Sequence, residues 1–544
     1  MKIVFFRIVT VAFVSVALLS PNVNAAPAPL PVKPKVCVYL GWDALRASVQ
    51  DVYEHRELFA KTGFDGLAMN VNGVRADGRG FFGRRVMASH RFDRGQFNDV
   101  IPLIKKLLVT EGLKESLFAV YWMGTSKRRI GWADDAAWAE FYHNMSFVCS
   151  FAKELGFKGL FIDHEDYTGK PLFKWNKSAD PSYKETVALA RRRGVETAQA
   201  MSKGDENVRF LFERSLLQLA GSIRSQTPHE TSALEGDLWY PFLNGFVEGM
   251  TPGMKLIEGC ESGYGARIAR DYRALVGECR YIALEMLEPQ LRAKYIAQSE
   301  MGFGKYLDGW VKGKYSLEVD IPTTLFGAGV YSESLFWVYG EGCSVVPWKK
   351  KMHPRSSTMP WSEKFPGLPE LLRVSVGDYS ALRAKAAANE LVNLVSNPGC
   401  EVKGKGKVPS PFQVWTAKKT KESLAAHDAA VGCSAAGSIK YKPGAGCITF
   451  KAGGISPGDK VYATFCAKGR DVLGDVVWVK GGAWQWKKDY QFLAKASGEL
   501  KDGWKRYECA LIAPEDVDGV GFIISARPNE GECAWFDDIS IYRW

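Results

Sequence analysis

Residues 134–166 read DDAAWAEFYHNMSFVCSFAKELGFKGLFIDHED and contain a helix, a turn and a strand in one continuous unit. Between residues 138 and 155, apolar side chains recur at three- and four-residue steps, which predicts an amphipathic helix. Asp134 or Asp135 can cap the start of this helix, and Gly156 can take the left-handed conformation that ends it. The unit therefore predicts a surface helix that is followed at once by a strand.

The strand that follows this helix ends in three carboxylates. Its apolar run, residues 160–162, stops abruptly at Asp163, Glu165 and Asp166. Because successive side chains of a strand point to opposite faces, we expect Asp163 and Glu165 to face one way and His164 the other. The carboxylates are either an ordinary acidic loop or part of a functional site.

Similar units recur through the first two-thirds of the chain. Residues 36–350 alternate between short apolar runs and amphipathic stretches, and eight β-α units can be counted. This predicts an α/β fold, a (β/α)8 barrel of the TIM type, since an open doubly wound sheet is expected to carry a glycine-rich loop after its first strand. The other strands are expected at residues 36–44, 63–73, 116–124, 207–216, 254–265, 301–310 and 333–342. The other helices are expected at residues 47–61, 97–109, 186–202, 234–250 and 266–299.

The composition changes after about residue 390. From there, short alternating runs such as KVYATFCAKG are separated by Gly, Pro and Asp. Strands of even length at regular spacing are typical of an all-β sandwich, which is predicted at residues 391–544. Residues 351–390 are expected to be a bridging segment between the two domains.

The N-terminus has the pattern of a targeting segment. Lys2 and Arg7 flank the start of an apolar run, and small residues at 23–25 offer a cleavage site. This predicts a signal peptide at residues 1–25 and a stiff, proline-rich leader at residues 26–35. No later stretch of sequence is apolar enough to span a membrane, so we expect a secreted or periplasmic protein without a membrane anchor.

The formal net charge is +11, and the excess of basic residues is spread thinly. It indicates either simple solubility or attraction to anionic partners such as acidic polysaccharides. No nucleic-acid-binding motif accompanies the charge, so no nucleic-acid partner is expected. The sequence gives no indication of the oligomeric state.

Eleven cysteines are present, and no two of them form a CxxC motif. This argues against a zinc ribbon or a thioredoxin-type site. Many of them lie inside apolar runs, which predicts buried free thiols. Six follow residue 399, where an exported protein can also form one or two disulfides whose pairing the sequence does not reveal.

Polar and aromatic residues collect at the predicted C-terminal ends of the strands, where barrel enzymes carry their active sites. The carboxylates at these ends are Asp43, Asp163, Glu165, Asp166, Glu213, Glu258, Glu261, Asp308 and Glu341. The residues expected to contact a substrate are Trp42, Asn70, Asn72, Tyr121, Trp122, Tyr167, Asp308 and Trp337. Glycosidic cleavage needs a carboxylic acid to protonate the departing oxygen and a second carboxylate as base or nucleophile. The set therefore favours polysaccharide or glycan hydrolysis.

The spacing of Asp163 and Glu165 suggests individual roles. Two carboxylates that are close together cannot easily both be charged, so their pKa values separate, which predicts Glu165 as the acid and Asp163 as its modulator. His164 is the only histidine at a predicted strand end and faces away from them, so neither a catalytic metal nor another cofactor is expected. The second catalytic carboxylate is expected among Glu261, Glu341 and, third, Asp308.

The stretch GFKGLFIDHEDY (residues 156–167) resembles the strand-four pattern of secreted barrel glycosidases. It is similar to the end of the family 18 chitinase signature, Asp-x-Glu, which Asp163 and Glu165 match. The two earlier aspartates of that signature are Lys158 and Phe161 in this chain. The resemblance implies the barrel glycoside hydrolase class, with an acid role for Glu165.

A second resemblance covers the C-terminal domain. NLVSNPGCE (393–401) and AWFDDISIYRW (534–544) look like the first and last strands of jelly-roll carbohydrate-binding modules. In such modules the opening Glu and the closing Asp often hold a structural calcium ion, which hard oxygen ligands suit. The resemblance therefore implies a calcium site at Glu401 with Asp537 or Asp538.

Tryptophans of the C-terminal domain could form a glycan-binding platform. Trp484 and Trp486 share one face if their segment is a strand, and Lys487 and Lys488 would flank a charged glycan. The alternative is that some of these rings belong to the core, since a sandwich needs aromatic side chains inside.

Two functions from different classes thus remain open. The first is a secreted glycoside hydrolase with a carbohydrate-binding module, and the second is a non-catalytic carbohydrate-binding protein on a barrel scaffold. Another hydrolase or a lyase on the same barrel is a third, because a fold alone does not decide the reaction. An enzyme needs a second carboxylate roughly 5–10 Å from Glu165.

Overall fold

The structure is a computed structural model. It describes residues 35–544 apart from 89, 123–128, 167–170, 217–235, 268, 309–319, 403–406, 417–423, 443, 445, 487–490 and 515. The predicted signal peptide, nearly all of the leader, Tyr167, Lys487 and Lys488 lie outside the described residues.

Residues 36–340 contain a nine-stranded sheet whose neighbouring strands are parallel. The order across the sheet is β10-β11-β1-β2-β5-β6-β7-β8-β9. The strands are β1 (Val36–Gly41), β2 (Gly66–Met69), β5 (Leu117–Tyr121), β6 (Leu160–Asp163), β7 (Arg209–Phe212), β8 (Lys255–Glu258), β9 (Ser299–Met301), β10 (Gly304–Tyr306) and β11 (Leu335–Gly340).

The sheet is strongly curled. Phe161 of β6 and Trp337 of β11 are separated by three strands in the sheet order, yet their ring centroids lie 5.2 Å apart. The two outermost strands, β9 and β10, are consecutive in the chain, with only Gly302 and Phe303 between them. The Gly302 N–H donates to the Glu258 carbonyl (2.8 Å), and the Trp337 N–H donates to the Phe303 carbonyl (3.0 Å). One short segment therefore bonds to β8 on one side and to β11 on the other.

Alternating side chains of these strands supply two separate apolar surfaces. Side chains on the inner face, among them Val38, Ala119, Phe161 and Trp337, form one buried cluster. The intervening residues belong to a larger core against the helices. This pattern explains why the strands read as continuous apolar runs, since both faces of the sheet are covered.

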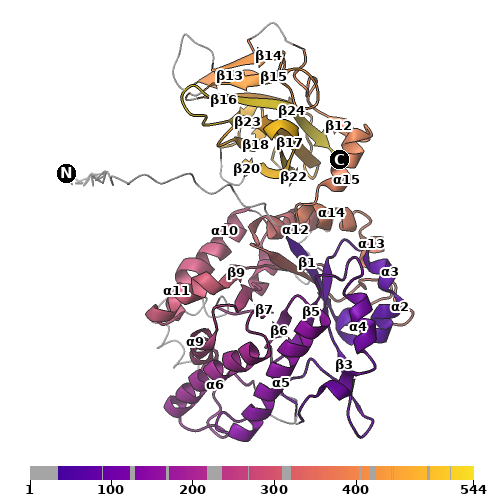
Figure 1. Ribbon diagram of the computed structural model, residues 1–544, viewed down its shortest axis with the longest axis vertical. Helices are drawn as coiled ribbons and strands as arrows, with labels where there is room; N and C mark the ends of the chain where they lie inside the picture. The colour runs from indigo at the N-terminus through magenta and orange to yellow at the C-terminus, as the bar shows by residue number, and fades with distance from the viewer. Residues whose placement is uncertain are drawn as a thin grey trace, which may run out of the picture. The chain divides into compact units, whose positions relative to one another are not determined.

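Helices lie around the parallel strands (Figure 1). The close contact of α6 with α9 depends on small residues, because a Cβ added at Gly194 would meet the Phe242 carbonyl at 2.1 Å and one at Gly245 would meet the Arg191 carbonyl at 1.9 Å. The helices of this part are α1 (Trp42–Arg46), α2 (Val49–Glu54), α3 (Arg56–Phe59), α4 (Ile101–Leu107), α5 (Asp135–Leu155), α6 (Tyr183–Gly204), α9 (Trp239–Gly249), α10 (Ala269–Gly277), α11 (Pro289–Gln298) and α12 (Asp320–Tyr331).

Helix α5 begins and ends as its sequence predicts. The Asp134 side chain accepts the Ala137 N–H (3.0 Å), and Gly156 ends α5 with φ 96°. The single helix expected at residues 266–299 is wrong: α10 ends at Gly277, irregular helical turns follow, and Pro289 starts α11. Sequence analysis also missed α12 and a hairpin of β3 (Asn72–Val74) with β4 (Gly80–Phe82).

The C-terminal part consists of two antiparallel sheets, and their facing side chains form one buried core. Phe465 of one sheet and Phe522 of the other make an edge-on contact at 5.7 Å within this core. The seven-stranded sheet contains β12 (Val392–Asn393), β14 (Ala425–Asp428), β15 (Ser438–Tyr441), β17 (Lys460–Lys468), β21 (Lys495–Glu499), β22 (Lys505–Ile512) and β24 (Ala534–Arg543). The six-stranded sheet contains β13 (Gln413–Thr416), β16 (Gly446–Gly453), β18 (Leu473–Lys480), β19 (Ala483–Trp484), β20 (Gln491–Leu493) and β23 (Gly519–Ser525).

Residues 351–390 carry three short helices, α13 (Trp361–Lys364), α14 (Leu368–Ser375) and α15 (Ser380–Ala387). All eleven cysteines are free thiols, and the five in the first two-thirds of the chain are buried, as predicted. Among the helices of the described residues, none is both long and apolar enough to cross a membrane.

Candidate functional site

Three carboxylates meet at the C-terminal ends of β6 and β7. Asp163 is the last residue of β6, Glu165 follows it, and Glu213 comes directly after β7. One oxygen from each of the three side chains lies within 4.8 Å of the other two. Asp163 is hydrogen-bonded to Glu213, and its Oδ1 also accepts the N–H of Glu165 at 2.8 Å. His164 turns away and stacks on Trp239 at 4.1 Å, so the predicted separation of neighbouring side chains is observed.

Burial makes this cluster hold a proton. Removal from water raises the pKa of Asp163 to about 7, and the nearby Glu165 carboxylate adds to the increase. Burial raises the pKa of Glu213 well above its usual range, with further contributions from Asp163, Glu165 and Glu261. Glu213 is 6% exposed, and its Oε2 has no hydrogen-bond partner among the described residues. The Asp163–Glu213 pair therefore retains a proton at neutral pH.

Arg214 joins this pair to a fourth carboxylate. Its Nη2 contacts oxygens of both Glu165 and Glu261, so one guanidinium nitrogen bridges the two carboxylates. Glu261 follows β8, and burial raises its pKa while Arg214 lowers it. Of the three residues predicted as the partner of Glu165, Glu261 is the one that the structure brings beside it.

Two buried side chains hold the backbone that carries these groups. Glu258, at the end of β8, accepts the backbone N–H groups of Ser215 (3.0 Å), Leu216 (2.9 Å) and Cys260 (3.3 Å), and also the Ser215 hydroxyl. Lys305 on β10 donates to the carbonyls of Gly263 and, at 2.8 Å, Ala266. Glu258 thus fixes the turn with Glu213 and Arg214, and Lys305 fixes the turn that begins at Glu261.

Glu341 and Asp308 belong to a second carboxylate group. Glu341 accepts the Tyr339 hydroxyl at 2.7 Å, and its backbone N–H donates to Asp308. Asp308 also accepts the Gly342 N–H at 2.8 Å. Burial raises the pKa of Asp308, and the partner N–H groups offset part of this increase. These contacts join the turn after β10, which carries Asp308, to the loop after β11, which carries Glu341.

Three tyrosines connect the two groups. Tyr306 lies 5.3 Å from Tyr339 and 5.6 Å from Tyr264, measured between ring centroids. Burial raises the pKa of Tyr264, with Glu213 and Glu261 as the next causes, and that of Tyr339, with Glu341 as the next cause. Sequence analysis did not identify Tyr264 or Tyr306, although both lie close to the predicted ends of strands.

Trp42 lies at the end of β1 and contacts side chains of the bridging segment. His353 meets its ring edge-on at 4.1 Å, and the Arg355 guanidinium lies 4.8 Å from the ring centroid. Burial lowers the pKa of His353, and the positive charges of Arg46 and Arg355 lower it further. This places a half-buried aromatic face beside basic groups.

The structure corrects two of the predicted substrate contacts. Trp122 is completely buried, and its indole N–H faces the Met145 sulfur at 3.2 Å. Trp337 is also completely buried, and it donates to the Gly259 carbonyl at 2.8 Å. Both rings therefore pack beneath the strand ends and do not line them, because alternate strand residues point into the core.

The other predicted contacts are placed as follows. Asn70 is buried and donates to Asn72 at 2.6 Å, and Tyr121 lies under the Arg84 guanidinium at 4.8 Å. The sequence pattern placed Glu213 at a strand end but assigned it no role, and it did not point to Arg214. The signal for both was a Glu-Arg doublet directly after an apolar strand.

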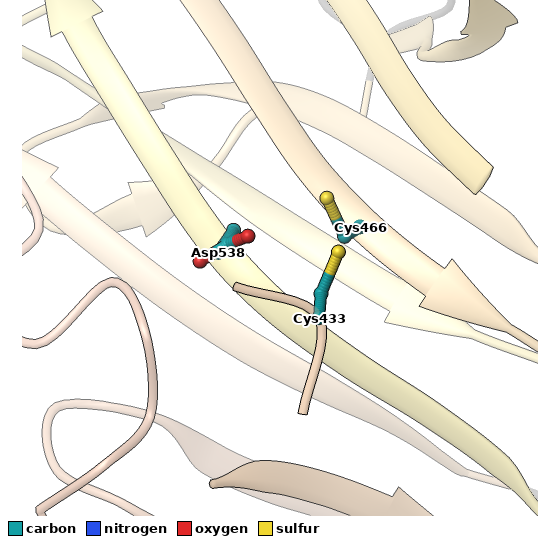
Figure 2. A group of neighbouring side chains, drawn as sticks. All are labelled: Cys433, Cys466 and Asp538. Atoms are coloured by element: carbon teal, nitrogen blue, oxygen red, sulfur yellow. The ribbon is translucent and has the colours of Figure 1, made fainter. Parts of the chain in front are cut away.

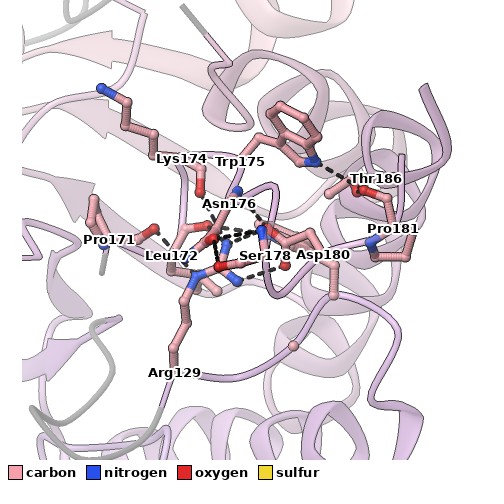
Figure 3. Close-up of polar contacts among 12 residues, drawn as sticks. Arg129, Pro171, Leu172, Lys174, Trp175, Asn176, Ser178, Asp180, Pro181 and Thr186 are labelled. Carbon is pink, nitrogen blue, oxygen red and sulfur yellow. Dashed lines mark hydrogen bonds and ion pairs between the residues drawn. The ribbon is translucent and has the colours of Figure 1, made fainter. Parts of the chain in front are cut away.

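A buried ion pair holds the segment 171–182, which follows β6 in the chain (Figure 3). Arg129 makes two bonds to Asp180, at 2.6 and 2.8 Å, and donates to the Lys174 carbonyl at 3.0 Å. Asp180 also accepts the Asn176 N–H at 2.8 Å. The Arg129 side chain is 9% exposed and that of Asp180 is fully buried.

Replacing Asp180 with asparagine should lower the free energy of unfolding by about 3 kcal/mol, because it leaves a buried guanidinium without its counter-charge. Urea denaturation of the two proteins measures this difference. The matched control is Asp205→Asn, whose partner Lys153 is largely exposed, and which should cost less than about 1 kcal/mol. Equal losses for the two variants would contradict a special role of the buried pair.

In the C-terminal part, Trp484 and Trp486 lie together with ring centroids 6.2 Å apart. Trp486 is 63% exposed, and Lys451 lies 4.7 Å from the Trp484 ring centroid. Asp537 is fully buried, and its oxygens accept the N–H groups of Cys433 (2.6 Å) and Asp538 (2.7 Å). Burial raises the pKa of Asp537 to about 7, with Asp538 and the exposed Glu401 as further causes.

No protein-family model and no curated protein sequence matches the chain. Among solved structures, it is similar to the enzymatically active domain of tailspike protein 4 from bacteriophage CBA120, with 14% identity and a TM-score of 0.23 over 28% of this chain and 22% of that chain. It is also similar to the CBM22-1 xylan-binding domain of Xyn10C from Paenibacillus barcinonensis, with 11% identity and a TM-score of 0.21 over 28% of this chain and 95% of that one. A third structure is TmCBM61 in complex with β-1,4-galactotriose, with 16% identity and a TM-score of 0.21 over 28% and 99% of the two chains. TM-scores of this size do not establish a common fold.

Proposed function

We propose that the chain is an exported glycoside hydrolase that acts on a polysaccharide or other glycan. The observation that carries the proposal is the meeting of two kinds of carboxyl group at the ends of β6, β7 and β8. The Asp163–Glu213 pair retains a proton, and Arg214 forms ion pairs with both Glu165 and Glu261. A proton donor beside an ionised carboxylate is the requirement for glycosidic cleavage.

In this proposal Asp163 is the general acid. It is the less buried member of the proton-sharing pair, and Glu213 lies behind it as a positioning residue that bonds to its carboxyl group. This exchanges the roles predicted from sequence, where Glu165 was the acid. The reason is that Arg214 forms an ion pair with Glu165, whereas burial raises the pKa of Asp163 to about 7.

Glu261 is the second catalytic carboxylate in this proposal. It contacts the same guanidinium nitrogen of Arg214 as Glu165 does, and it follows β8, whereas Asp163 ends β6. It either attacks the anomeric carbon or activates a water molecule, and the anomer of the first product decides between the two. Tyr264, Tyr306 and Tyr339 offer aromatic faces for the sugar rings next to the cleaved bond.

We also propose the finer architecture on which this function depends. The curled sheet would close as a (β/α)8 barrel in which β9 and β10 act as one strand, and the hydrogen bonds of this segment to both neighbours support it. The C-terminal sheets would form a jelly-roll carbohydrate-binding module. We also propose a calcium ion at Glu401 and Asp537, supported by the electrostatic interaction of Asp537 with the carboxylates of Asp538 and Glu401.

The proposal is tested by incubating the mature chain with neutral and anionic polysaccharides and measuring the release of reducing ends. Wild type should cleave at least one glycan, and Glu261→Ala should not. If Glu261 is a nucleophile, azide should restore turnover to Glu261→Ala and yield a glycosyl azide, whereas Glu165→Ala should show no such rescue. Binding of a glycan without cleavage would instead favour a non-catalytic carbohydrate-binding protein. Full activity of Glu261→Ala would show that the assignment is wrong.

The pH dependence should report the Asp163–Glu213 pair. Activity is expected to fall as the pH rises through about 7, where Asp163 loses its proton. Glu213→Leu removes a hydrogen bond that lowers the pKa of Asp163, so the alkaline limb of kcat/KM should move to higher pH. A pH series of kcat/KM on both proteins measures this shift. An unchanged limb, or a shift to lower pH, would contradict the pairing.

The exposed tryptophan pair supports a glycan-binding role for the C-terminal part. Trp486→Ala should weaken binding of the cleaved polysaccharide about tenfold, which corresponds to the ~1.4 kcal/mol of one aromatic contact. Titration calorimetry measures this, and hydrolysis of a short soluble oligosaccharide should stay unchanged. Trp415→Ala is the matched control, since Trp415 on β13 is 58% exposed. Equal effects of the two substitutions would contradict a specific platform.

A further inference from the structure

Two thiols and a carboxylate converge in the C-terminal part, and none of the three is among the residues assigned above to glycan chemistry. Cys433 lies in the loop before β15, Cys466 lies on β17 and Asp538 lies on β24. Figure 2 shows their side chains at one place, coming from three separate segments. The two sulfur atoms and one Asp538 oxygen all lie within 4.8 Å of one another.

The backbone is irregular at this place. The pairing of β17 with β24 shifts its register between Thr464 and Cys466, so a bulge directs the Cys466 side chain. Asp538 adopts a left-handed conformation with φ 48°, which is uncommon for a residue other than glycine. Both deviations affect residues of the cluster. Neither occurs where two antiparallel strands pair regularly.

Hydrogen bonds fix the two less buried members. The Cys433 N–H donates to Asp537 at 2.6 Å, and the Ser434 hydroxyl donates to Asp538 at 2.6 Å. Such bonds from neighbouring groups are what orients the ligands in metal sites. Cys466 is almost completely buried, whereas Cys433 and Asp538 are half-buried, so the cluster can be reached from the solvent on their side.

We propose that Cys433, Cys466 and Asp538 form a binding site for a soft divalent cation, with Zn²⁺ as its best-fitting ion. Thiolate sulfur selects zinc over calcium and magnesium, which prefer sites made only of oxygen. Two sulfurs and one oxygen occupy three corners of a tetrahedron, and water can take the fourth. The site differs in chemistry from the calcium site proposed at Glu401 and Asp537, which offers oxygen alone.

Zinc binding at this place must displace protons. Burial raises the pKa of Cys433 to about 11 and raises that of Cys466 as well, so both thiols are protonated at neutral pH in the metal-free chain. Metal ligands of this type bind as thiolates, so each zinc ion should release up to two protons. Arg506, hydrogen-bonded to Cys466, opposes a cation at this site but stabilises the thiolate.

The test uses the full chain, freed of metal and kept reduced. Zinc is titrated in competition with a chromophoric chelator, with Ca²⁺ as a parallel arm. We expect each chain to take one Zn²⁺ ion from the chelator and to release protons as it does so. Ca²⁺ should not displace the bound Zn²⁺. Cys433→Ser and Cys466→Ser should each weaken zinc binding by about 100-fold or more, and Asp538→Asn by about tenfold. Cys447→Ser, at a half-buried cysteine of β16, is the matched control and should not change the affinity.

Three results would overturn the proposal. The reduced chain could fail to bind zinc, or its affinity could be unaffected by both Cys433→Ser and Asp538→Asn. The third is a Cys433–Cys466 disulfide in the protein as purified from its export compartment, found by peptide mapping as a loss of two hydrogens. Cys466→Ser alters a buried position and could prevent folding, so thermal unfolding of each variant without metal checks that it is folded. Cys433 and Asp538 are half-buried, so their variants test the proposal even if Cys466→Ser does not fold.

Discussion

Asp163→Asn is expected to lower kcat/KM for glycan hydrolysis about 10³-fold, the usual contribution of a general acid. The substitution removes the transferable proton but keeps size and neutrality, since Asp163 is itself protonated below about pH 7. The asparagine oxygen can still accept the Glu165 N–H, which Asp163 accepts at 2.8 Å. The protein should therefore remain folded, with little change in melting temperature.

Steady-state kinetics at pH 6 measure the loss, with Asp99→Asn, at an exposed position, as the control. An infrared band of a protonated carboxyl group should also be present in wild type at this pH and weaker in Asp163→Asn. This second measurement needs no substrate, so it tests the retained proton separately from catalysis. A variant that keeps more than a tenth of the wild-type rate would remove Asp163 from the acid role.

Glu258→Ala should have the largest effect on stability, lowering the free energy of unfolding by about 4 kcal/mol. The carboxylate accepts three backbone N–H groups and one hydroxyl, and all of these donors are buried. Each buried donor left without a partner costs roughly 1–3 kcal/mol. Because these bonds hold the turn with Glu213 and Arg214, activity should fall together with stability.

Urea denaturation of both proteins gives the difference in unfolding free energy. Glu258→Gln should lose less, since its amide oxygen can still accept some of the N–H groups. Glu57→Ala is the surface control, because the Glu57 side chain is 79% exposed, and it should stay within about 0.5 kcal/mol of wild type. A loss for Glu258→Ala as small as that of the control would show that the turn does not depend on this carboxylate.

Much of the parallel sheet could be predicted from sequence because its signals are local. The helix from residue 135 to residue 155 carries its own cap and its own terminating glycine, and the strand beyond it is a plain apolar run. The expected long helix at residues 266–299 failed because helical periodicity continued across Gly277 and Pro289, which end and restart the chain's helices. The spacing of apolar residues alone does not reveal where one helix ends and the next begins.

The site was predictable only in part, for a physical reason. The rule that strand ends carry function led to Asp163, Glu165 and Glu261, which the structure brings together, because the rule depends on strand direction alone. The proton-sharing of Asp163 with Glu213 and the bridging by Arg214 depend on distances between segments that are 50 residues apart in the chain (213 − 163). The burial of Trp122 and Trp337 could not be predicted either, because it depends on which face of the strand each side chain occupies.

The pairing of β1 with β11 has a consequence for how the protein is made. Val36 lies opposite Leu335, so the first strand waits for a partner that is synthesised 299 residues later (335 − 36). At about 5–20 residues per second, the ribosome needs roughly 15–60 s to supply it. During that time one edge of β1 has open backbone groups, which attract other strands. Incomplete chains should therefore be prone to aggregation, and stop codons before residue 335 are expected to yield insoluble products.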